Sequence, residues 1–157
     1  MFKLMKIAVL SDTHNLLRPE VIEIIKSSNA VIHGGDINSQ GVLDEIIYVM
    51  KPNAQLFVVR GNNDKELAAN LPVSLDFELG GLKFFLTHNR KDIPQDIKAD
   101  IIIFGHSHKY HEENISGQVW LNPGSCGRKR FNLPITMAVM NVNDNEYSIE
   151  KIELEGE

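Results

Sequence analysis

Several short polar motifs carry the side chains of this sequence that could do chemistry. Seven of these side chains are potential metal ligands, namely Asp12, His14, Asp36, Asn62, His88, His106 and His108. This mixed set of nitrogen and oxygen donors suits Mn²⁺, Fe²⁺, Zn²⁺ or Ni²⁺ better than Ca²⁺ or Mg²⁺. Seven donors exceed what one ion needs. They therefore predict two ions ~3.5–4 Å apart, an arrangement that polarises a phosphoryl group and activates water.

These donors must be positioned by the elements that precede them. Apolar runs predict strands at 6–10, 30–33 and 55–59, and helical spacing of apolar residues predicts helices at 19–28 and 41–50. Alternating strands and helices imply parallel pairing through right-handed crossovers. Most of the donors follow the C-terminal end of a predicted strand, which is where open α/β sheets place their ligands.

The second half of the sequence changes character. It predicts a hairpin at 73–87 with a Gly80-Gly81 turn, a buried strand at 100–104 after a short helix near 93–98, and a hairpin at 136–154. Antiparallel strands therefore join the parallel ones. We expect an α/β fold with mixed strand directions, and a single domain spanning residues 1–157.

Composition and charge limit the class of protein. The 157 residues are 43% apolar and carry a formal net charge of −5, which argues against a protein that holds long nucleic acid by backbone electrostatics. The single Cys126 cannot form an internal disulfide, so we expect a reducing, cytoplasmic location. The first apolar run, 7–10, is too short for a signal segment or a membrane span, and no membrane partner is expected.

In their order along the chain, the motifs resemble those of the calcineurin-like metallophosphoesterases: D-x-H, G-D, G-N-H-D/E, a later His, and G-H-x-H. The matching segments are Asp12-Thr13-His14, Gly35-Asp36, Gly61-Asn62-Asn63-Asp64, Thr87-His88 and Gly105-His106-Ser107-His108. Asn122-Pro123-Gly124-Ser125 and the compact chain look like the short prokaryotic phosphodiesterase branch of YfcE type. That branch also contains a retromer scaffold subunit.

The resemblance implies a four-layer α/β/β/α sandwich with mixed sheets. It implies that one divalent ion is held by Asp12, His14 and His108, and the other by Asn62, His88 and His106, with Asp36 bridging them. Mn²⁺ is the expected metal, and Ni²⁺, Fe²⁺ and Zn²⁺ are alternatives.

The implied reaction is in-line attack on a phosphoric ester by a hydroxide that bridges the two ions, with no covalent enzyme intermediate. The residues expected to take part directly are Asp36, Asn62 and His88, while Asp64 is expected to orient a neighbouring group. A small phosphodiester or a nucleotide-like molecule is the expected substrate, and the oligomeric state is left open.

Two positions depart from the family pattern. Asn63 replaces a histidine that can protonate the leaving group, and a neutral amide cannot act as a general acid. This departure favours activated or diester-like substrates over alkyl monoesters, and Asn63 is expected to contact the substrate instead. Arg90 stands where relatives tend to have a second histidine; it could reach a substrate phosphate or simply be a solvated surface arginine. For Arg128, in the basic run 128–130, a substrate-binding rim and a solvated surface are both open.

Other features have a simpler interpretation. His33 lies inside a predicted strand, where a structural histidine is favoured over a ligand, and Cys126 is expected to pack in a loop. Two alternative functions remain: a protein-interaction scaffold of the same fold, like the retromer subunit, and a phosphomonoesterase or nucleotide hydrolase. The intact set of seven donors favours the phosphodiesterase.

Overall fold

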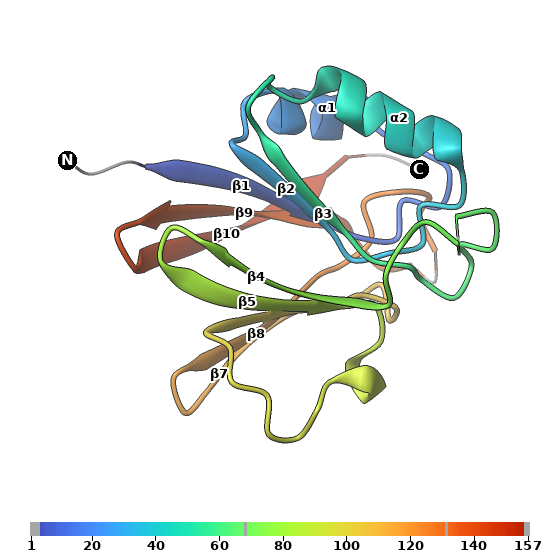
Figure 1. The fold of residues 1–157 in the computed structure, drawn as a ribbon. Coiled ribbons are helices and arrows are strands. Elements are labelled where there is room, and N and C mark those ends of the chain that lie inside the picture. Colours follow the sequence, from blue (N-terminus) through green and yellow to red (C-terminus); the bar gives the residue numbers. More distant parts are fainter. Residues whose placement is uncertain (1–3, 68, 131, 156–157) are drawn as a thin grey trace.

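Two mixed β-sheets pack face to face in the computed structural model, which describes residues 4–67, 69–130 and 132–155 (Figure 1). The first sheet has the strand order β10-β9-β1-β2-β3. Its parallel strands are β1 (Met5–Leu10), β2 (Ala30–His33) and β3 (Gln55–Val58). The hairpin of β9 (Ile135–Asn143) and β10 (Glu146–Leu154) adds antiparallel to β1.

The second sheet has the strand order β4-β5-β6-β8-β7. Its three central strands, β5 (Leu82–Thr87), β6 (Ile101–Ile103) and β8 (Gln118–Pro123), are parallel. The edge strands β4 (Ser74–Leu79) and β7 (Tyr110–Ile115) are antiparallel to their neighbours.

The main core lies between the sheets and follows from the alternation of side chains along each strand. In β1, Ile7 and Val9 join a cluster that includes Phe84 and Ile101 of the second sheet, whereas Ala8 and Leu10 belong to the cluster on the opposite face. Both faces of β1 are therefore buried. This double burial explains why its sequence is continuously apolar rather than alternating.

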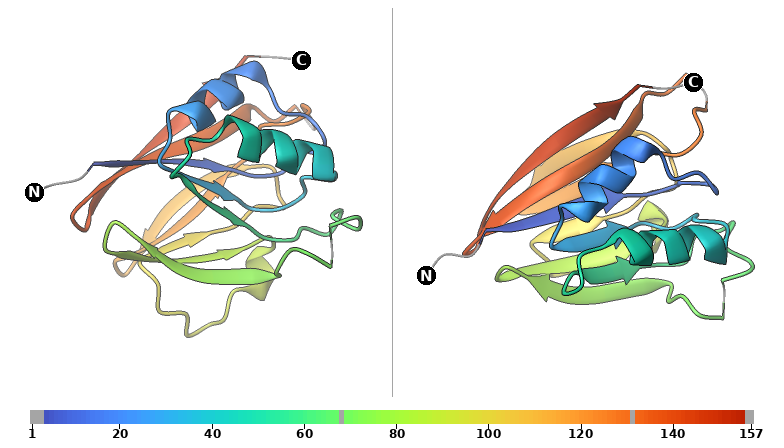
Figure 2. Two further views of the ribbon diagram at one scale, coloured as in Figure 1. Left: turned by 45° about the horizontal axis from the view of Figure 1, so that its top comes forward. Right: turned by 90° about the horizontal axis from the view of Figure 1, so that it is seen from above.

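Two helices cover the outer face of the first sheet (Figure 2). Helix α1 (Pro19–Lys26) begins at a proline, whose fixed φ suits the first helical turn. Helix α2 (Gln40–Val49) begins after Ser39, whose side chain accepts a hydrogen bond from the backbone N–H of Val42. No helix in the described part of the chain is both long and apolar enough to cross a membrane.

The fold class expected from the sequence is confirmed: the protein is α/β with two mixed sheets. The short helix expected at 93–98 is wrong. The chain instead forms a 3₁₀ turn, η1 (Arg90–Asp92), and Ile93 is extended with ψ of 121°. Pro94 explains the difference, because the residue before a proline is disfavoured in the helical region. Ile93 packs with Phe85 and Phe104 on the outer face of the second sheet.

The hairpin of β7 and β8 has no counterpart in the sequence prediction. Its two turn residues, Ser116 and Gly117, have φ of 53° and 86°, as expected for a tight two-residue hairpin turn. Four of the six residues of β7 are exposed, so this edge strand lacks the apolar alternation that reveals a strand in sequence.

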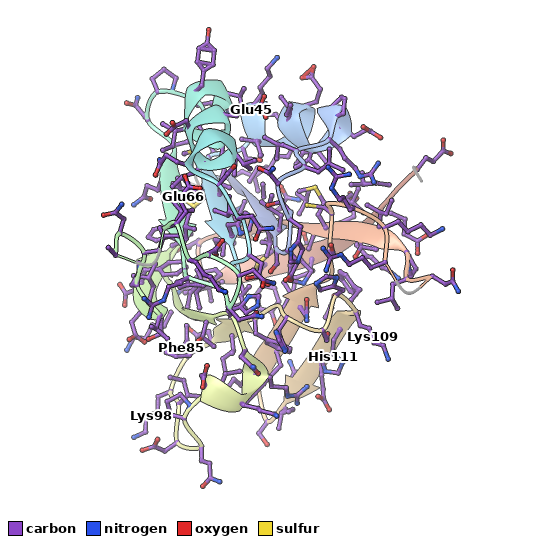
Figure 3. The ribbon with its side chains drawn as sticks, turned by 90° about the vertical axis from the view of Figure 1, so that its right-hand side faces the viewer. Glu45, Glu66, Phe85, Lys98, Lys109 and His111 are labelled. Atoms are coloured by element: carbon purple, nitrogen blue, oxygen red, sulfur yellow. The ribbon has the colours of Figure 1, made fainter. Side chains whose placement is uncertain are left out.

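The topology brings one end of both sheets together. The loops after β1, β2, β3, β5 and β6 gather at the right-hand end in Figure 1, and Figure 3 looks onto this end. At the opposite end the turns of the two hairpins touch, because the Asn145 backbone N–H donates to the Gly80 carbonyl. The sequence motifs therefore meet at the end where the parallel strands finish.

Candidate metal centre

The loops that carry the expected ligands have an unusual backbone. The φ angles of Asp12, His14, Asp36, His106 and His108 all lie between 45° and 77°. This left-handed region costs a non-glycine residue about 1–2 kcal/mol, and such strain persists where the surrounding structure fixes it, often at functional sites. Five expected ligands share this strained geometry, which marks these loops as the functional end of the fold.

Hydrogen bonds between loops hold this backbone in place. The N–H groups of Asp12 and His14 donate to the carbonyls of Gly35 and Asp36, each at 2.9 Å. Gly61 must remain a glycine, because a Cβ there would collide with the side chain and backbone of Asp36. The loops after β1, β2 and β3 are thus locked against one another.

Asp12, His14 and His108 form the first group of potential ligands. Asp12 Oδ1 lies 3.6 Å from His14 Nε2 and 3.4 Å from His108 Nε2, and the two ring nitrogens are 3.2 Å apart. All three residues are buried. This set brings one carboxylate and two imidazoles to a single point, as the sequence predicts.

Asp12, Asp36 and His88 form the second group, in which the ligand atoms lie within 4.8 Å of one another, as they do in the first group. Asp36 Oδ2 is 3.3 Å from His88 Nε2 and 3.7 Å from His14 Nε2, so this carboxylate faces both groups. Asn62 Oδ1 is 3.0 Å from His88 Nε2. The opposite ring nitrogen, Nδ1, lies 2.7 Å from the carbonyl of Gly34 and donates to it, which leaves Nε2 of the neutral ring free to bind a metal.

Two buried oxygens test whether these residues fit a metal. Asp12 Oδ1 has no hydrogen-bond partner within the described chain, although it faces three imidazole nitrogens. A cation at this point would satisfy the oxygen, which is otherwise costly to bury. Asn38 Oδ1 likewise lacks a partner among the described residues, while its Nδ2 lies 3.4 Å from His14 Nδ1. If the amide of Asn38 is rotated by 180°, Oδ1 can accept a hydrogen bond from Nδ1–H of His14. In that tautomer of His14 the proton is on Nδ1, so Nε2 is free to bind a metal.

Charge interactions tune the acids and bases of the site. Burial alone would raise the pKa of Asp12, but the adjoining imidazoles of His108, His14 and His88 outweigh it and lower the pKa. Burial also opposes ionisation of Asp36, yet its hydrogen bonds to His88 and to the Asn63 N–H keep its pKa below the usual value. Both carboxylates are therefore ionised at neutral pH, as metal ligands must be.

The same interactions act on His88. Burial opposes its protonation, but the hydrogen bond to Asp36 and the charges of Asp12 and Asp36 raise its pKa above the usual value. The negative charges of Asp12 and Asp36 therefore favour a positive charge at this point. In the metal-free protein a proton on His88 can supply it, and a bound metal cation would supply it instead.

Asp64 supports the site through hydrogen bonds to the backbone of the ligand-bearing loops. Its Oδ2 accepts hydrogen bonds from the backbone N–H groups of Asp36 and Gly61 at 2.8 and 2.9 Å, and its Oδ1 accepts from Asn38 N–H at 2.7 Å. The residue is 1% exposed. This geometry agrees with the expected orienting role, because one carboxylate fixes the strained backbone of Asp36.

His33 is a structural residue, in agreement with the sequence interpretation. It is fully buried, its Nδ1 accepts from Gly35 N–H at 3.0 Å, and its Nε2 therefore carries the proton that is donated to Thr13 Oγ1 at 3.1 Å. The ring thus links the loop after β1 to the loop after β2. Neither this link nor the contact of Asn38 with His14 can be predicted from sequence motifs, because both depend on contacts between distant loops.

The remaining expected site residues lie farther from the two groups. His106 is exposed and outside both groups, with its ring edge-on to His88 at a centroid distance of 5.3 Å. Asn63 donates to Asp36 from its backbone N–H at 2.8 Å and from Nδ2 at 3.3 Å. Arg90 is paired with Glu113, and Arg128 is exposed in a surface depression that His108 also lines. Cys126 is buried, and burial raises the pKa of its thiol to about 12, so it is not a reactive nucleophile.

Comparison with known proteins agrees with this geometry. The model of the calcineurin-like phosphoesterase superfamily domain matches residues 5–145. The chain belongs to this superfamily. Phosphodiesterase MJ0936 of Methanocaldococcus jannaschii is 32% identical, over 91% of this chain and 96% of that protein. The family is metal-dependent, and this chain has candidate groups of metal ligands.

Solved structures show the same fold. A structure described as a novel archaeal phosphodiesterase has 27% identity and a TM-score of 0.73, covering 96% of this chain and 100% of that one. A mutant of Vps29 from Entamoeba histolytica has a TM-score of 0.75 at 20% identity, covering 96% and 100% of the two chains. The second likeness concerns the fold alone.

The role of Asp64 can be tested with Asp64→Asn. This change keeps the size of the side chain but weakens its hold on three backbone N–H groups, and loss of such supporting contacts typically reduces metal affinity ~10–100-fold. We expect a loss in this range for Mn²⁺, measured by isothermal titration calorimetry. The exposed Asp96→Asn is the matched control for the loss of one charge. Equal affinity in both variants would show that Asp64 does not position the site.

The buried ring of His33 predicts a pH dependence of stability. Burial lowers its pKa from 6.5 to about 4, so between these values the unfolded chain takes up a proton that the folded protein excludes. His33 therefore contributes full stability above pH 6.5, and about 3 kcal/mol of it is lost as the pH falls to 4. In urea unfolding of the metal-free protein, the free energy of unfolding of His33→Asn should fall less between pH 6.5 and 4 than that of the wild type. The asparagine keeps an acceptor for the N–H of Gly35. The same pH dependence in both proteins would contradict this assignment.

Proposed function

We propose that this protein is a dinuclear metal-dependent phosphodiesterase that hydrolyses a phosphoric ester by in-line attack of activated water. The observation that carries the proposal is the position of two buried carboxylates between the two ligand groups. Asp12 belongs to both groups, and Asp36 Oδ2 faces an imidazole of each. This double set of ligands is more than a mononuclear site needs.

The proposed ligands are those that the sequence motifs predict. Asp12, His14 and His108 would hold one ion, Asn62, His88 and His106 the other, and Asp36 would lie between them. The compact first group supports the first assignment. The amide oxygen of Asn62 beside His88 Nε2, and the ring of His106 edge-on to His88, support the second. Mn²⁺ is the metal we expect first, with Ni²⁺, Fe²⁺ and Zn²⁺ as alternatives.

Bound at these positions, two divalent cations would neutralise phosphoryl oxygens and lower the pKa of the attacking water. The chain itself supplies orientation. Gly34 fixes the ring of His88 through Nδ1, and Asp64 fixes the backbone of Asp36. Both contacts are in place before substrate arrives, so little reorganisation is needed.

Asn63 cannot assist the departure of the leaving group. Asn63 occupies the position at which the family pattern has a histidine, and its N–H groups already donate to Asp36. Because an amide cannot release a proton, the leaving oxygen must depart with help from water or as a stable anion. The site therefore favours esters with good leaving groups, such as aryl diesters.

The proposed function can be tested with metal-free protein that is reconstituted with Mn²⁺, Ni²⁺ or Zn²⁺. We expect metal-dependent hydrolysis, faster for bis-p-nitrophenyl phosphate than for p-nitrophenyl phosphate. Asp36→Ala should lower the rate at least ~100-fold. Loss of a residue that merely supports a metal ligand can reduce activity ~10–100-fold, and Asp36 is itself a proposed ligand. Asp96→Ala, at an exposed position, should keep the wild-type rate.

Each of the other outcomes contradicts part of the proposal. A folded protein that is inactive with every metal would favour the scaffold. A faster rate on the monoester would favour a phosphomonoesterase.

A further inference from the structure

A pocket of about 490 Å³ opens directly beside the proposed metal centre. Its inner end is formed by residues 105–107, which include the proposed ligand His106. One side is the 89–91 segment after β5, and the other is the 109–111 segment that leads into β7. Lys109 and His111 lie close together at this end of the second sheet (Figure 3). A group attached to a phosphate at the metal centre could therefore extend into this pocket.

Arg90 is held in a fixed position at one side of the pocket. Its guanidinium carbon lies 5.0 Å from the centre of the Trp120 ring and 5.4 Å from that of Phe104, both within the range of cation–π contacts. Nη2 of Arg90 is also 3.7 Å from Glu113 Oε1. The side chain nevertheless remains 47% exposed. The guanidinium thus lies close to two aromatic rings, while about half of the side chain stays accessible to a ligand.

His111 is positioned by the same carboxylate as Arg90. Its Nε2–H donates to Glu113 Oε1 at 3.1 Å, and its ring lies 6.3 Å from that of Phe104. Glu113 therefore fixes a planar cation and an imidazole ring, both of which line the pocket.

The chemistry of the lining selects the type of ligand. Arg90, Lys91 and Lys109 contribute three positive charges, and the described residues that line the pocket include no acid. Phe104, Tyr110 and His111 add aromatic surface. Planar bases stack well on arginine and on aromatic side chains, and anionic phosphates are attracted to lysine. The pocket suits a ligand that combines a planar base with negative charge.

We propose that this pocket binds the nucleoside part of a nucleotide-type phosphoester, with the base stacked on the guanidinium of Arg90. The inference rests on the proposed function, since it places the phosphate at the metal centre beside His106. It differs from both roles that the sequence leaves open for Arg90, a contact with a substrate phosphate and a solvated surface position. We assign Arg90 a stacking role because its positive charge is already partly neutralised by Glu113.

The proposal can be tested by binding adenosine 5′-monophosphate and ribose 5-phosphate to the Mn²⁺-loaded protein. Ribose 5-phosphate carries a hydroxyl group at the position where adenosine 5′-monophosphate carries adenine. Trp120 is the only tryptophan in the sequence and touches Arg90, so its fluorescence should report binding in the pocket. We expect adenosine 5′-monophosphate to bind about tenfold more tightly, as stacking of one base typically allows.

Variants separate stacking from charge. Arg90→Ala and Arg90→Lys should each remove most of this tenfold preference, because an ammonium group cannot stack as a guanidinium does. Lys98→Ala removes an exposed cation outside this pocket and should keep the preference. Equal affinity for the two probes in the wild type, or a full preference in Arg90→Lys, would overturn the proposal.

Hydrolysis of bis-p-nitrophenyl phosphate in the same preparations separates this inference from the proposed function. Turnover without any preference for the base overturns the pocket assignment alone. A preference that depends on Arg90, in a protein without turnover, supports the pocket as a nucleotide site and overturns the enzyme.

Discussion

The structure depends on the burial of two carboxylates, Asp12 and Asp36, at the point where two sheets meet. Burying an ion is costly unless it is paired and hydrogen-bonded, and an unpaired buried charge typically costs several kcal/mol. The fold supplies the Ser11 hydroxyl and the N–H groups of His106 and Asn63, which satisfy three of the four carboxylate oxygens, while Asp12 Oδ1 has no hydrogen-bond partner among the described residues. A bound metal cation would complete this arrangement.

The rest of the fold is organised to create this point. Parallel strands place their carboxyl ends together, and the two sheets pack through a shared apolar core that includes Ile7, Val9, Phe84 and Ile101. The connecting loops then adopt a left-handed backbone at five expected ligands, with Asp64 and His33 holding the loops from behind. The stability of the core thus offsets the strain and the desolvation of the site.

Much of this arrangement could be predicted from the sequence. The strands at β1, β2 and β3, both helices of the first half, and the hairpins at β4–β5 and β9–β10 have local patterns of apolar residues and turns. Spacing alone does not reveal β7, which is largely exposed, and Pro94 interrupts the helix expected after η1. Edge strands and loop conformations depend on contacts with distant residues, which a single sequence does not display.

The site likewise combines features that motifs predict with features that depend on contacts between distant residues. The motif order placed Asp12, His14 and His108 together, and the structure brings them to one point. Asp64 is expected to orient a neighbouring group rather than to bind a metal, and its carboxylate accepts hydrogen bonds from three backbone N–H groups. The support from His33 and the pairing of Arg90 with Glu113 could not be foreseen, since each joins segments that are separated in the sequence.

A crystal structure of the protein grown with Mn²⁺, in which anomalous scattering locates the metal, tests the dinuclear assignment most directly. We expect two peaks ~3.5–4 Å apart, separated by the carboxylate of Asp36. Asp12, His14 and His108 should contact one peak, and Asn62, His88 and His106 the other. A single peak, or metal bound away from these residues, would contradict it.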